Sequence, residues 1–565
     1  MSSSQRRYDA LVVGSGAAGS IAVKELTERG MDVLLLEAGR DISEADFVPR
    51  PEVTPTAMGI SLGGRVRASL RGQYLQSRRP RFNEQVLPFL VNDVKHPYAA
   101  DGRYLWIRGR QLGGRLHSYG RVLLRLSDSE FKAASQDGYG EDWPLCYADL
   151  APFYDRVEEF IGVYGSTESL PNLPDGRYRG ASLLTSAEKD FKATVESRWP
   201  TRHVVAWRYA APNLHRVPLG ILAARRTGRL TTRTDAIVTK IAVNPRTGRA
   251  DGALYIDRLR KRAQRVFADV VVVCASAIES TRLLLNSATD GHPNGLANFS
   301  GLLGRYFMDH TPSLLYGTDP HHPGFEAADQ APPDPYYPPI GGIYIPRFEN
   351  IEEETSTEFA RGWAVQGTVG RMPVPDGSDG VVGLMGFGEM PPYHHNRITV
   401  HPRRTDAWGI PIPHVHLSLT DNERALLRAQ VRGLREMAEA SRFRVNFAAS
   451  TLGLDSTKIW PDADPIKRTI FRLGVTRSLA MGAAIHECGG ARMGDDPATS
   501  VLNGFNQSWD IPNLFVTDAS AYPSSGGVGP ALTIMALTAR ACDHIAREHA
   551  DGSLHRQPLR TPPAC

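Results

Sequence analysis

A glycine-rich turn near the start of the chain has the residue types and spacing of a dinucleotide-binding site. The turn G-S-G-A-A-G occupies residues 14–19, between a short apolar strand and a helical pattern. Gly14 would permit the tight turn, Gly16 would let the backbone approach a pyrophosphate, and Gly19 would let the helix pack closely on the strand. A second strand is expected over residues 33–36, which completes the strand–turn–helix–strand order that this fingerprint requires.

Glu37 directly follows that second strand, 23 residues after Gly14. A carboxylate at this place can accept hydrogen bonds from both ribose hydroxyls of an adenosine, and it would repel a 2′-phosphate, which argues against NADP. The helix that begins after the turn would present its N–H groups and the positive end of its dipole to the pyrophosphate. The alternative is a Gly-rich turn in an ordinary βαβ unit.

Length and composition limit the remaining possibilities. With 565 residues the chain is too long for one core, so two or more domains are expected. It is 41% hydrophobic and 22% charged with a net charge of +4, which is typical of a globular protein and disfavours nucleic acid as a partner. No apolar run approaches the roughly 20 residues that span a bilayer, so no membrane partner is expected.

The N-terminus and the cysteines predict a cytoplasmic location. The start, MSSSQRR, leads almost directly into the first strand and leaves no room for a signal peptide. The cysteines are scattered, odd in number and without a C-x-x-C pair, so we expect reduced thiols and neither a disulfide framework nor a zinc site. They are Cys146, Cys274, Cys488, Cys542 and Cys565.

Two later segments predict further parts of a parallel sheet around the first turn. Residues 270–273 form an apolar strand followed at once by a helix, which is typical of a buried parallel strand. Near the C-terminus a strand over residues 514–517 ends at Asp518, and a Ser/Gly-rich loop then leads into a helix from about residue 531 to residue 548. A ligand held between two helix starts from opposite ends of the chain suits this arrangement.

The middle of the chain has a different character. Short strand-like segments at residues 342–345 and 381–384, with a long helix over residues 420–440, predict an antiparallel sheet backed by helices. We expect this part to form a substrate domain. The pair His394-His395 lies in it, but adjacent histidines point apart on most backbones, so no metal site is predicted.

With both terminal segments in view, the chain resembles the glucose–methanol–choline (GMC) family of FAD-dependent oxidoreductases. The resemblance rests on VVGSGAAGS…LLLEAGR, the internal GRQLGG and CASAIESTRLLLNS, and HECGGARMG…PATSV…NLFVTDASAYPSSGG…PALTIMAL near the C-terminus. These segments cover nearly all of the presumed cofactor domain, and the middle matches weakly. The branch of glucoside 3-dehydrogenases and bacterial pyranose or C-glycoside 3-oxidases looks nearest.

The resemblance implies FAD and a set of residues that bind it. The ADP end would lie on the first turn and Glu37, the adenine near Val238, the isoalloxazine beside GRQLGG, and the pyrophosphate or ribityl chain at Asp518. By composition alone, GRQLGG is equally a Gly-rich crossover loop. The implied cofactor-binding residues are Gly14, Gly16, Ala17, Ala18, Gly19, Glu37, Ala38, Arg40, Arg110, Gly113, Gly114, Ser118, Val238, Ala275, Asp518, Ala519, Gly529, Pro530 and Thr533.

The catalytic histidine of the family falls on His486, in HECGGARMG. Alcohol oxidation delivers a hydride to flavin N5 and releases a proton from the hydroxyl, and an imidazole whose pKa lies near neutrality can accept that proton. The alternative is that His486 only caps a turn.

Two departures from the family pattern bear on mechanism. Many relatives have an Asn or a second His before the proline of the C-terminal loop, and Gly529 stands there in this chain. Another residue then covers that role, or catalysis is weakened, or the substrate is activated differently. Where some relatives attach the flavin covalently to a histidine, this chain has Ser118, with His117 one residue away. We therefore predict non-covalent FAD, with His117 as the alternative attachment point.

The sequence thus predicts an α/β fold with a discontinuous Rossmann-like FAD-binding domain and a substrate domain. The predicted function is oxidation of a sugar or glycoside secondary alcohol, with C3 favoured, to a ketone, and with O₂ or an electron carrier as acceptor. The alternatives are a tailoring oxidase of a non-sugar alcohol, a GMC-fold lyase without net redox and a dinucleotide-binding regulatory module. The FAD-binding domain is expected at residues 1–45, 98–160, 218–307 and 484–565, and the substrate domain with its excursions at 46–97, 161–217 and 308–483.

Overall fold

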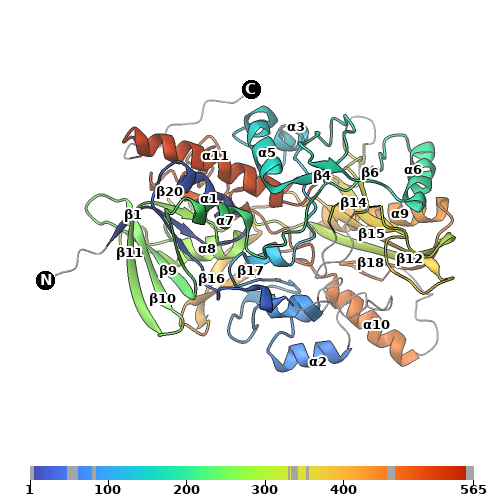
Figure 1. The fold of residues 1–565 in the computed structure, drawn as a ribbon, viewed down its shortest axis with the longest axis horizontal. Coiled ribbons are helices and arrows are strands. Elements are labelled where there is room, and N and C mark those ends of the chain that lie inside the picture. Colours follow the sequence, from blue (N-terminus) through green and yellow to red (C-terminus); the bar gives the residue numbers. More distant parts are fainter. Residues whose placement is uncertain are drawn as a thin grey trace.

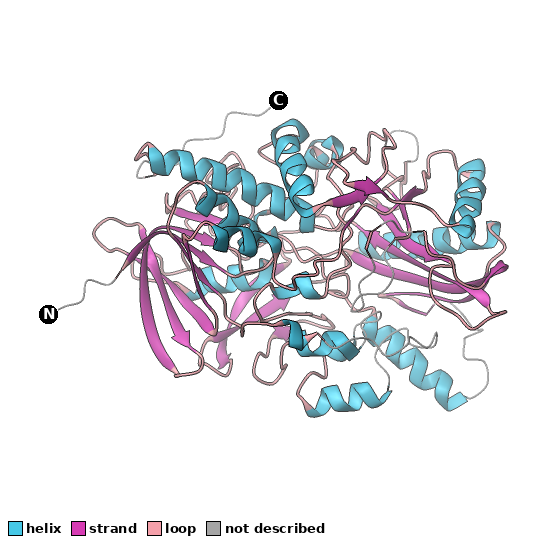
Figure 2. Cartoon of the chain, viewed as in Figure 1, coloured by secondary structure: helices cyan, strands magenta, loops and turns pink. Residues whose placement is uncertain are grey.

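The computed structural model describes residues 6–47, 62–78, 84–328, 331–332, 341–351, 355–454 and 465–554. Two large sheets lie at opposite ends of the molecule, with helices above and below them (Figure 1). The region between the two sheets contains long loops as well as short helices and strands (Figure 2). This α/β architecture agrees with the predicted fold class.

The first sheet has seven strands and is built from stretches that are far apart in the sequence. Its order is β8-β2-β1-β11-β10-β9, with β20 paired to β11. Strands β8, β2, β1, β11 and β20 run parallel, while β9 and β10 are antiparallel additions at one edge. The strands are β1 (Arg7–Val13), β2 (Val33–Leu36), β8 (Leu230–Arg233), β9 (Ala236–Val243), β10 (Ala250–Asp257), β11 (Arg262–Val273) and β20 (Leu514–Val516).

The central strands of this sheet are apolar because both faces are covered. Leu11 of β1, Leu34 of β2 and Val271 of β11 are all fully buried. Runs of this kind are typical of parallel strands that have helices on both faces. The helices associated with the sheet are α1 (Ala17–Glu28), α7 (Leu219–Arg226), α8 (Ala277–Asn286) and α11 (Ala531–Ala550). Helix α1 packs against both α7 and α11.

The second sheet also has seven strands, all antiparallel, in the order β19-β18-β12-β15-β14-β13-β6. Helix α9 (Asp421–Ala440) packs on β12, β15 and β18 with its apolar face, which includes Leu426, Leu434 and Met437. This confirms the expected antiparallel sheet backed by a helix. The strands are β6 (Val205–Ala206), β12 (Thr311–Pro323), β13 (Ile343–Ile345), β14 (Trp363–Val369), β15 (Asp379–Gly388), β18 (Arg444–Ser450) and β19 (Gly453–Leu454).

Smaller elements surround the two large sheets. The other helices longer than three residues are α2 (Leu62–Leu70), α3 (Asp128–Phe131), α4 (Ala133–Asp137), α5 (Tyr147–Ile161), α6 (Ser186–Arg198) and α10 (Pro465–Ser478), with 3₁₀ turns at Glu84–Phe89 and Gly114–His117. One small sheet joins β3 (Ala99–Ala100), β16 (Arg397–Thr405) and β17 (Pro411–His416), and another joins β4 (Val163–Gly165), β5 (Gly180–Ala181) and β7 (Tyr209–Ala210). The domain bounds given above stay predictions.

The structure corrects one expectation about the cysteines. Cys146, at the start of α5, is disulfide-bonded, so the prediction that every thiol is reduced is wrong for this residue. Cys274, Cys488 and Cys542 are free and buried, and Cys565 lies outside the described residues. The disulfide removes the thiol argument for a reducing compartment.

Among the described helices, none is both long enough and apolar enough to cross a bilayer.

Candidate active site

The glycine-rich turn predicted from the sequence joins β1 to α1 and is tightly packed. The N–H of Gly14 donates to Leu36 O at the end of β2 (2.8 Å). Gly14 has a φ of +96°, and a Cβ there would lie 2.6 Å from Cys274 O. A Cβ at Gly19 would lie 1.8 Å from Gly14 O, whereas one at Gly16 would meet nothing within 4 Å. The first and third glycines therefore close the turn, and the second borders open space.

Glu37 lies just beyond β2 and is buried against this turn. Its Oε2 accepts hydrogen bonds from the N–H of Ser15 (3.2 Å) and from Ser15 Oγ (2.5 Å), and its Oε1 accepts from the N–H of Gly39 (2.8 Å). Burial raises the pKa of Glu37, and these hydrogen bonds act in the opposite direction. The carboxylate therefore holds the glycine turn and the end of β2 together.

The second predicted glycine segment, GRQLGG, contacts the first. The N–H of Gly113 donates to Ser15 Oγ (2.9 Å), and a Cβ at Gly114 would lie 3.7 Å from the Cα of Gly16. Gly39 also touches the segment, because a Cβ there would lie 2.0 Å from Arg110 O. Three parts of the chain thus meet around Ser15.

Asp518 lies two residues after β20 and links this part of the chain to the start of α8. Its Oδ2 accepts from the N–H of Ser276 (2.9 Å) and from Ser280 Oγ, and its Oδ1 accepts from the N–H and Oγ of Ser520 (3.0 and 2.6 Å). Ala275 lies beside Gly14, whose Cβ position is 3.2 Å from the Cα of Ala275. The structure therefore brings Asp518 and Ala275 to the same edge of the sheet as the first turn.

Helices α1 and α11 begin at this edge with unused donors. Neither N-cap residue, Gly16 or Pro530, has a side chain that caps the helix, and neither helix has an acidic residue in its first turn. Because β1 and β20 are parallel and flank β11, the segments that follow them emerge on the same side of the sheet. Helices α1 and α11 also pack against one another, and each has an uncapped, positive N-terminal end, which suits an anionic group such as a pyrophosphate.

His486 lies close to the start of α11. A Cβ at Gly529, one residue before the N-cap Pro530, would lie 3.3 Å from Nε2 of His486. The other ring nitrogen, Nδ1, lies 2.9 Å from Nδ1 of His310. The N–H of His486 donates to Asp309 Oδ1 (3.3 Å). The histidine is thus fixed between the C-terminal loop and the segment that enters β12.

The backbone before His486 is strained. Ile485 has a φ of +61°, which is a marked outlier for a β-branched residue. Such conformations cost on the order of 1–3 kcal/mol and occur where the surroundings over-determine them, often at functional sites. The N–H of Ile485 donates to Gly482 O (3.1 Å), which holds this turn.

Glu487 and Ser525 add polar atoms next to His486 and to the C-terminal loop. Glu487 accepts from Arg115 Nη1 through Oε2 (2.6 Å). Its Oε1 is buried without a hydrogen-bond partner among the residues that the structure describes, and so is Ser525 Oγ. Buried polar atoms of this kind require an explanation, and a bound polar molecule is one.

The other predicted cofactor residues lie around these segments. Val238 is in β9, whose first residue donates its N–H to Glu37 O (2.9 Å). Thr533 Oγ1 lies 2.7 Å from Tyr154 Oη, and Pro530 O accepts from Tyr522 Oη (3.0 Å). Ala17 and Ala18 are in the first turn of α1, Ala519 follows Asp518, Ala38 and Arg40 follow Glu37, and Ser118 ends the 3₁₀ turn.

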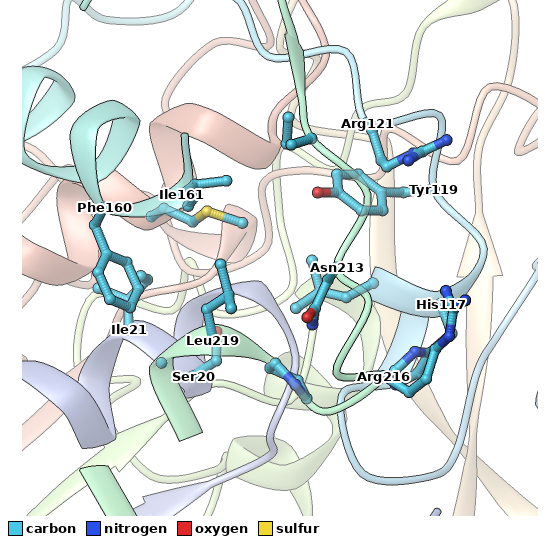
Figure 3. A pocket seen from close by; sticks show the side chains of 16 residues that line it. Ser20, Ile21, His117, Tyr119, Arg121, Phe160, Ile161, Asn213, Arg216 and Leu219 are labelled. Atoms are coloured by element: carbon cyan, nitrogen blue, oxygen red, sulfur yellow. The ribbon is translucent and has the colours of Figure 1, made fainter. Parts of the chain in front are cut away.

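His117 points into a packed region that borders a separate cavity. Its Nε2 lies 2.8 Å from Leu112 O, and its ring packs 5.6 Å from the rings of Phe47 and Phe89. Burial lowers the pKa of His117 to about 4. The cavity, of about 670 Å³ with its open mouth, has walls from α1, α5, α7 and α11, and Figure 3 shows His117 and Arg216 together at one side of it. His486 is not among its lining residues.

Sequence reasoning missed two groups of residues. One is His310 and Asp309, which contact His486, with Glu389, which accepts from the N–H of Gly526. The other is Asp101, His414 and His416, whose possible ligand atoms lie within 4.8 Å of one another. Asp101 is hydrogen-bonded to both histidines (2.8 and 2.5 Å), so these contacts account for the group without a metal. His394 and His395 are not part of it.

Comparisons with known proteins identify the family of the chain. Residues 8–312 match the N-terminal model and residues 392–538 the C-terminal model described as GMC oxidoreductase. The chain is 28% identical to 2-methyl-1,2-propanediol dehydrogenase of Mycolicibacterium austroafricanum, over 98% of this chain and 97% of the relative. It is 25% identical to C-glycoside 3-oxidase of Arthrobacter globiformis over 56% of this chain and 53% of that protein. Formate oxidase of Aspergillus oryzae, at 15% identity, has the same fold with a TM-score of 0.64 over 97% of this chain and 100% of that one.

The matched models cover both glycine segments, the Asp518 loop and His486. The chain therefore belongs to the GMC oxidoreductase family, and it is an FAD-dependent oxidoreductase that acts on alcohol or sugar hydroxyls.

Proposed function

We propose that the enzyme oxidises a secondary hydroxyl of a sugar or glycoside, with C3 favoured, to a ketone. The observation that carries this proposal is the position of His486, whose Nε2 faces Gly529 immediately before the start of α11. A base at this place lies beside the N-terminal end of α11, one of the two helix ends that would hold the cofactor. His486 would take the hydroxyl proton on Nε2, and FAD, when bound, supplies the acceptor for the hydride.

The residues of this chain fit FAD. The two uncapped helix starts provide backbone N–H groups for the pyrophosphate, and the open space beside Gly16 leaves room for a close approach. Ser15 uses both acceptor sites of Glu37 Oε2, and Gly39 uses one site of Oε1, so Oε1 keeps one site that a hydroxyl of the adenosine ribose would use. Glu487 directly follows His486, and Ser525 lies in the loop that leads to Gly529. Oε1 of Glu487 and Oγ of Ser525 have no partner among the described residues, and a bound polar ligand would pair with them.

We propose that the FAD is held without a covalent bond. Ser118, at the position expected for an attachment residue, has its Oγ 3.3 Å from Arg115 O. His117, the alternative, has its Nε2 against Leu112 O and its ring packed against the rings of Phe47 and Phe89. Acid denaturation would then release the flavin into the supernatant, whereas a covalent link would keep it on the precipitated protein.

Two relatives favour two different classes of substrate. The C-glycoside 3-oxidase favours a glycoside oxidised at C3, although that match spans only about half of each chain. The 2-methyl-1,2-propanediol dehydrogenase, which matches over nearly the whole chain, favours a smaller non-sugar alcohol. The absence of a side chain at Gly529 favours the second candidate as well, because no amide or imidazole from this position can hold a sugar hydroxyl. The acceptor would be O₂ or an electron carrier.

Anaerobic flavin reduction tests the proposal. The purified yellow enzyme would be mixed, without oxygen, with a panel of glycosides and of small alcohols, and the visible flavin absorbance would be followed. Bleaching by glycosides, with a ketone at C3 by NMR, is the expected result. Bleaching by small alcohols alone would select the non-sugar candidate, and turnover without bleaching would select a lyase. A His486→Ala variant should stay yellow and lose most of the reduction, and full activity in it would remove the base assignment.

A further inference from the structure

His310 contacts Nδ1 of His486, whereas Gly529 lies near Nε2 of the same ring. His310 follows Asp309 at the entry to β12, and its ring is almost perpendicular to that of His486, with centroids 4.9 Å apart and an interplanar angle of 88°. The two Nδ1 atoms are 2.9 Å apart, which is a hydrogen-bond distance. His310 is 1% exposed, so this contact lies away from bulk solvent on its side.

The direction of the hydrogen bond between the two rings follows from one backbone carbonyl. His310 Nε2 lies 2.8 Å from Gly526 O, and a carbonyl oxygen can only accept, so Nε2 carries a hydrogen. Burial lowers the pKa of His310, which favours the neutral ring with a single N–H. The Nδ1 of His310 must then accept, and Nδ1 of His486 must donate.

This arrangement determines which nitrogen of His486 is basic. A neutral imidazole with its hydrogen on Nδ1 has its lone pair on Nε2. Nε2 is the nitrogen that lies 3.3 Å from the Cβ position of Gly529. The lone pair therefore faces the C-terminal loop, where the proposed function requires the substrate hydroxyl to lie.

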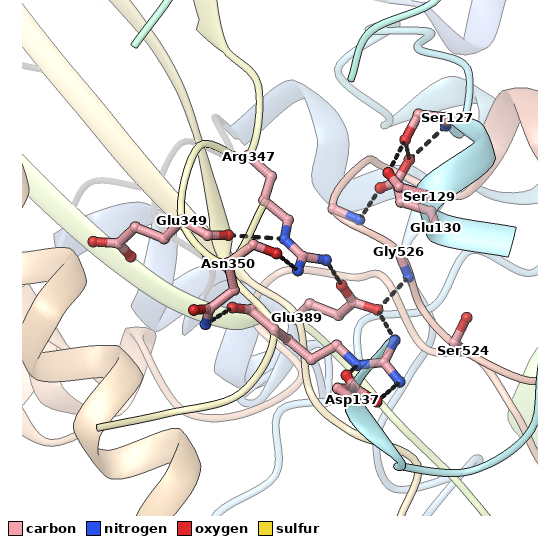
Figure 4. Close-up of polar contacts among 12 residues, drawn as sticks. Ser127, Ser129, Glu130, Asp137, Arg347, Glu349, Asn350, Glu389, Ser524 and Gly526 are labelled. Atoms are coloured by element: carbon pink, nitrogen blue, oxygen red, sulfur yellow. Dashed lines mark hydrogen bonds and ion pairs between the residues drawn. The ribbon is translucent and has the colours of Figure 1, made fainter. Parts of the chain in front are cut away.

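The carbonyl of Gly526 is itself held in place by two buried carboxylates. Glu389 Oε1 accepts from the N–H of Gly526 (3.2 Å), and Glu130 Oε1 accepts from the N–H of Gly527 (2.5 Å). Glu389 is paired in turn with Arg347 (3.1 Å), as Figure 4 shows, and Arg361 also pairs with it (2.9 Å). Burial acts to raise the pKa of Glu389, but the two guanidinium groups outweigh it and lower that pKa, so the carboxylate stays ionised.

We infer that His310 is a positioning residue that fixes the tautomer of His486, so that Nε2 is ready to accept the substrate proton. This inference rests on the proposed function of His486 as the base. When the hydroxyl proton reaches Nε2, His486 becomes a cation, and its Nδ1–H hydrogen bond to the neutral His310 becomes charge-assisted and stronger. His310 thus stabilises the protonated, charged form of His486 more than its neutral resting form. It does not replace the side chain missing at Gly529, because it contacts the opposite nitrogen.

The test compares two substitutions of His310 with a matched control. His310→Asn keeps an acceptor close to the position of Nδ1, whereas His310→Leu removes it. His292→Leu removes another buried histidine, one that stacks on Phe299 and does not contact His486. In steady-state turnover with an artificial electron acceptor, we expect His310→Leu to lower kcat by on the order of 10²-fold with KM changed less than threefold, since a wrong tautomer disables a base. His310→Asn should retain at least about 10-fold more of kcat than His310→Leu, and His292→Leu should equal the wild type.

A second measurement does not depend on turnover. In resting, FAD-loaded wild-type enzyme labelled with ¹⁵N-histidine, the His486 signals (identified by their loss in His486→Ala) should show hydrogen on Nδ1 and none on Nε2. Hydrogen on Nε2 in the wild type would overturn the inference, as would an unchanged kcat in His310→Leu. If His310→Leu does not fold, the wild-type spectrum and the kcat of His310→Asn decide. A wild-type enzyme that no alcohol reduces would instead refute the proposed function and leave the tautomer measurement intact.

Discussion

Gly529 and His486 are so close that a single methyl group at position 529 would lie 3.3 Å from Nε2 of the histidine. This is the space that a hydroxyl must enter to give its proton to Nε2, because such a transfer needs a separation of about 2.6–3.2 Å. Gly529 does not have a positive φ, so a larger residue is compatible with its backbone. The lack of a side chain therefore controls access to the base.

Gly529→Ala should consequently obstruct the substrate without disturbing the cofactor. We expect kcat/KM for flavin reduction to fall by about 10-fold or more, because small displacements of a reacting group are costly. The visible spectrum of the flavin should stay unchanged. Gly291→Ala is the control, since a Cβ there meets nothing within 4 Å and its φ is also not positive. Equal kcat/KM for Gly529→Ala and wild type would show that the substrate approaches His486 from elsewhere.

Ser15 joins three parts of the cofactor region, and Ser15→Ala should weaken all of them. Its Oγ donates to Glu37 Oε2 (2.5 Å) and accepts from the N–H of Gly113 (2.9 Å). Without it a buried carboxylate and a buried N–H each lose a partner, which costs about 1–3 kcal/mol of the free energy of unfolding. Urea denaturation and FAD titration by fluorescence would measure the losses of stability and of affinity. Ser20→Ala is the control, since Ser20 Oγ donates only to Ala17 O within α1 (3.1 Å), and a comparable loss there would contradict the explanation.

The parts of the fold that the sequence predicted well are those with strong local patterns. The strand at residues 33–36 is β2 without change. The helix expected over residues 420–440 is α9 (Asp421–Ala440), because its apolar residues recur with helical spacing. The strand expected over residues 270–273 is only the end of β11 (Arg262–Val273), whose first residues pair with β10. Those first residues are exposed, so no apolar run marks this part of the strand in the sequence.

The relationships that the sequence did not reveal are long-range contacts between polar side chains. His310 lies 176 positions before His486, and nothing in the local pattern at Asp309-His310 shows that β12 brings the two rings together. Asp101 meets His414 across 313 positions for the same reason. The glycine segments were easier to identify, because a tight turn limits the residue types in its own sequence. The error at Cys146 has a similar origin, since the spacing of cysteines does not specify which ones meet.

Glu487 follows His486 in the sequence, and its buried carboxylate pairs with the partly exposed guanidinium of Arg115. Its Oε2 accepts from Arg115 Nη1 at 2.6 Å, and the Glu487 side chain is 1% exposed. Glu487→Ala would leave Arg115 with Ser276 Oγ as a hydrogen-bond acceptor but without the opposite charge, and breaking such a pair lowers the free energy of unfolding by roughly 3 kcal/mol. Thermal and urea unfolding would measure this. Arg260→Ala breaks the exposed pair with Asp257 and should cost less than about 1 kcal/mol. Similar losses in the two variants would show that the Arg115 pair is not effectively buried.

Asp309 makes stability depend on pH in a direction opposite to that of most carboxyl groups. Burial, reinforced by the charge of Glu487, raises the pKa of Asp309 to about 8 from an ordinary value of 3.8. Hydrogen bonds from the N–H groups of His310 and His486 and from Tyr104 Oη act in the opposite direction but do not offset this. The folded protein therefore keeps a proton that the unfolded chain releases. The stabilising effect of this retained proton is complete below pH 3.8 and is lost as the pH rises through about 8.

Asp309→Asn should remove this dependence. An asparagine resembles the protonated acid, because its Oδ1 can still accept from the N–H groups of His310 and His486, and it has no proton to lose in this range. Between pH 5 and pH 8, we expect the wild type to lose up to about 1.4 kcal/mol per pH unit relative to the variant, which is the value for one proton. Urea denaturation at matched ionic strength across this range would measure the difference. Parallel stability curves would mean that Asp309 is ionised in the folded protein, and the segment that carries His310 and His486 would then hold a buried negative charge beside the proposed base.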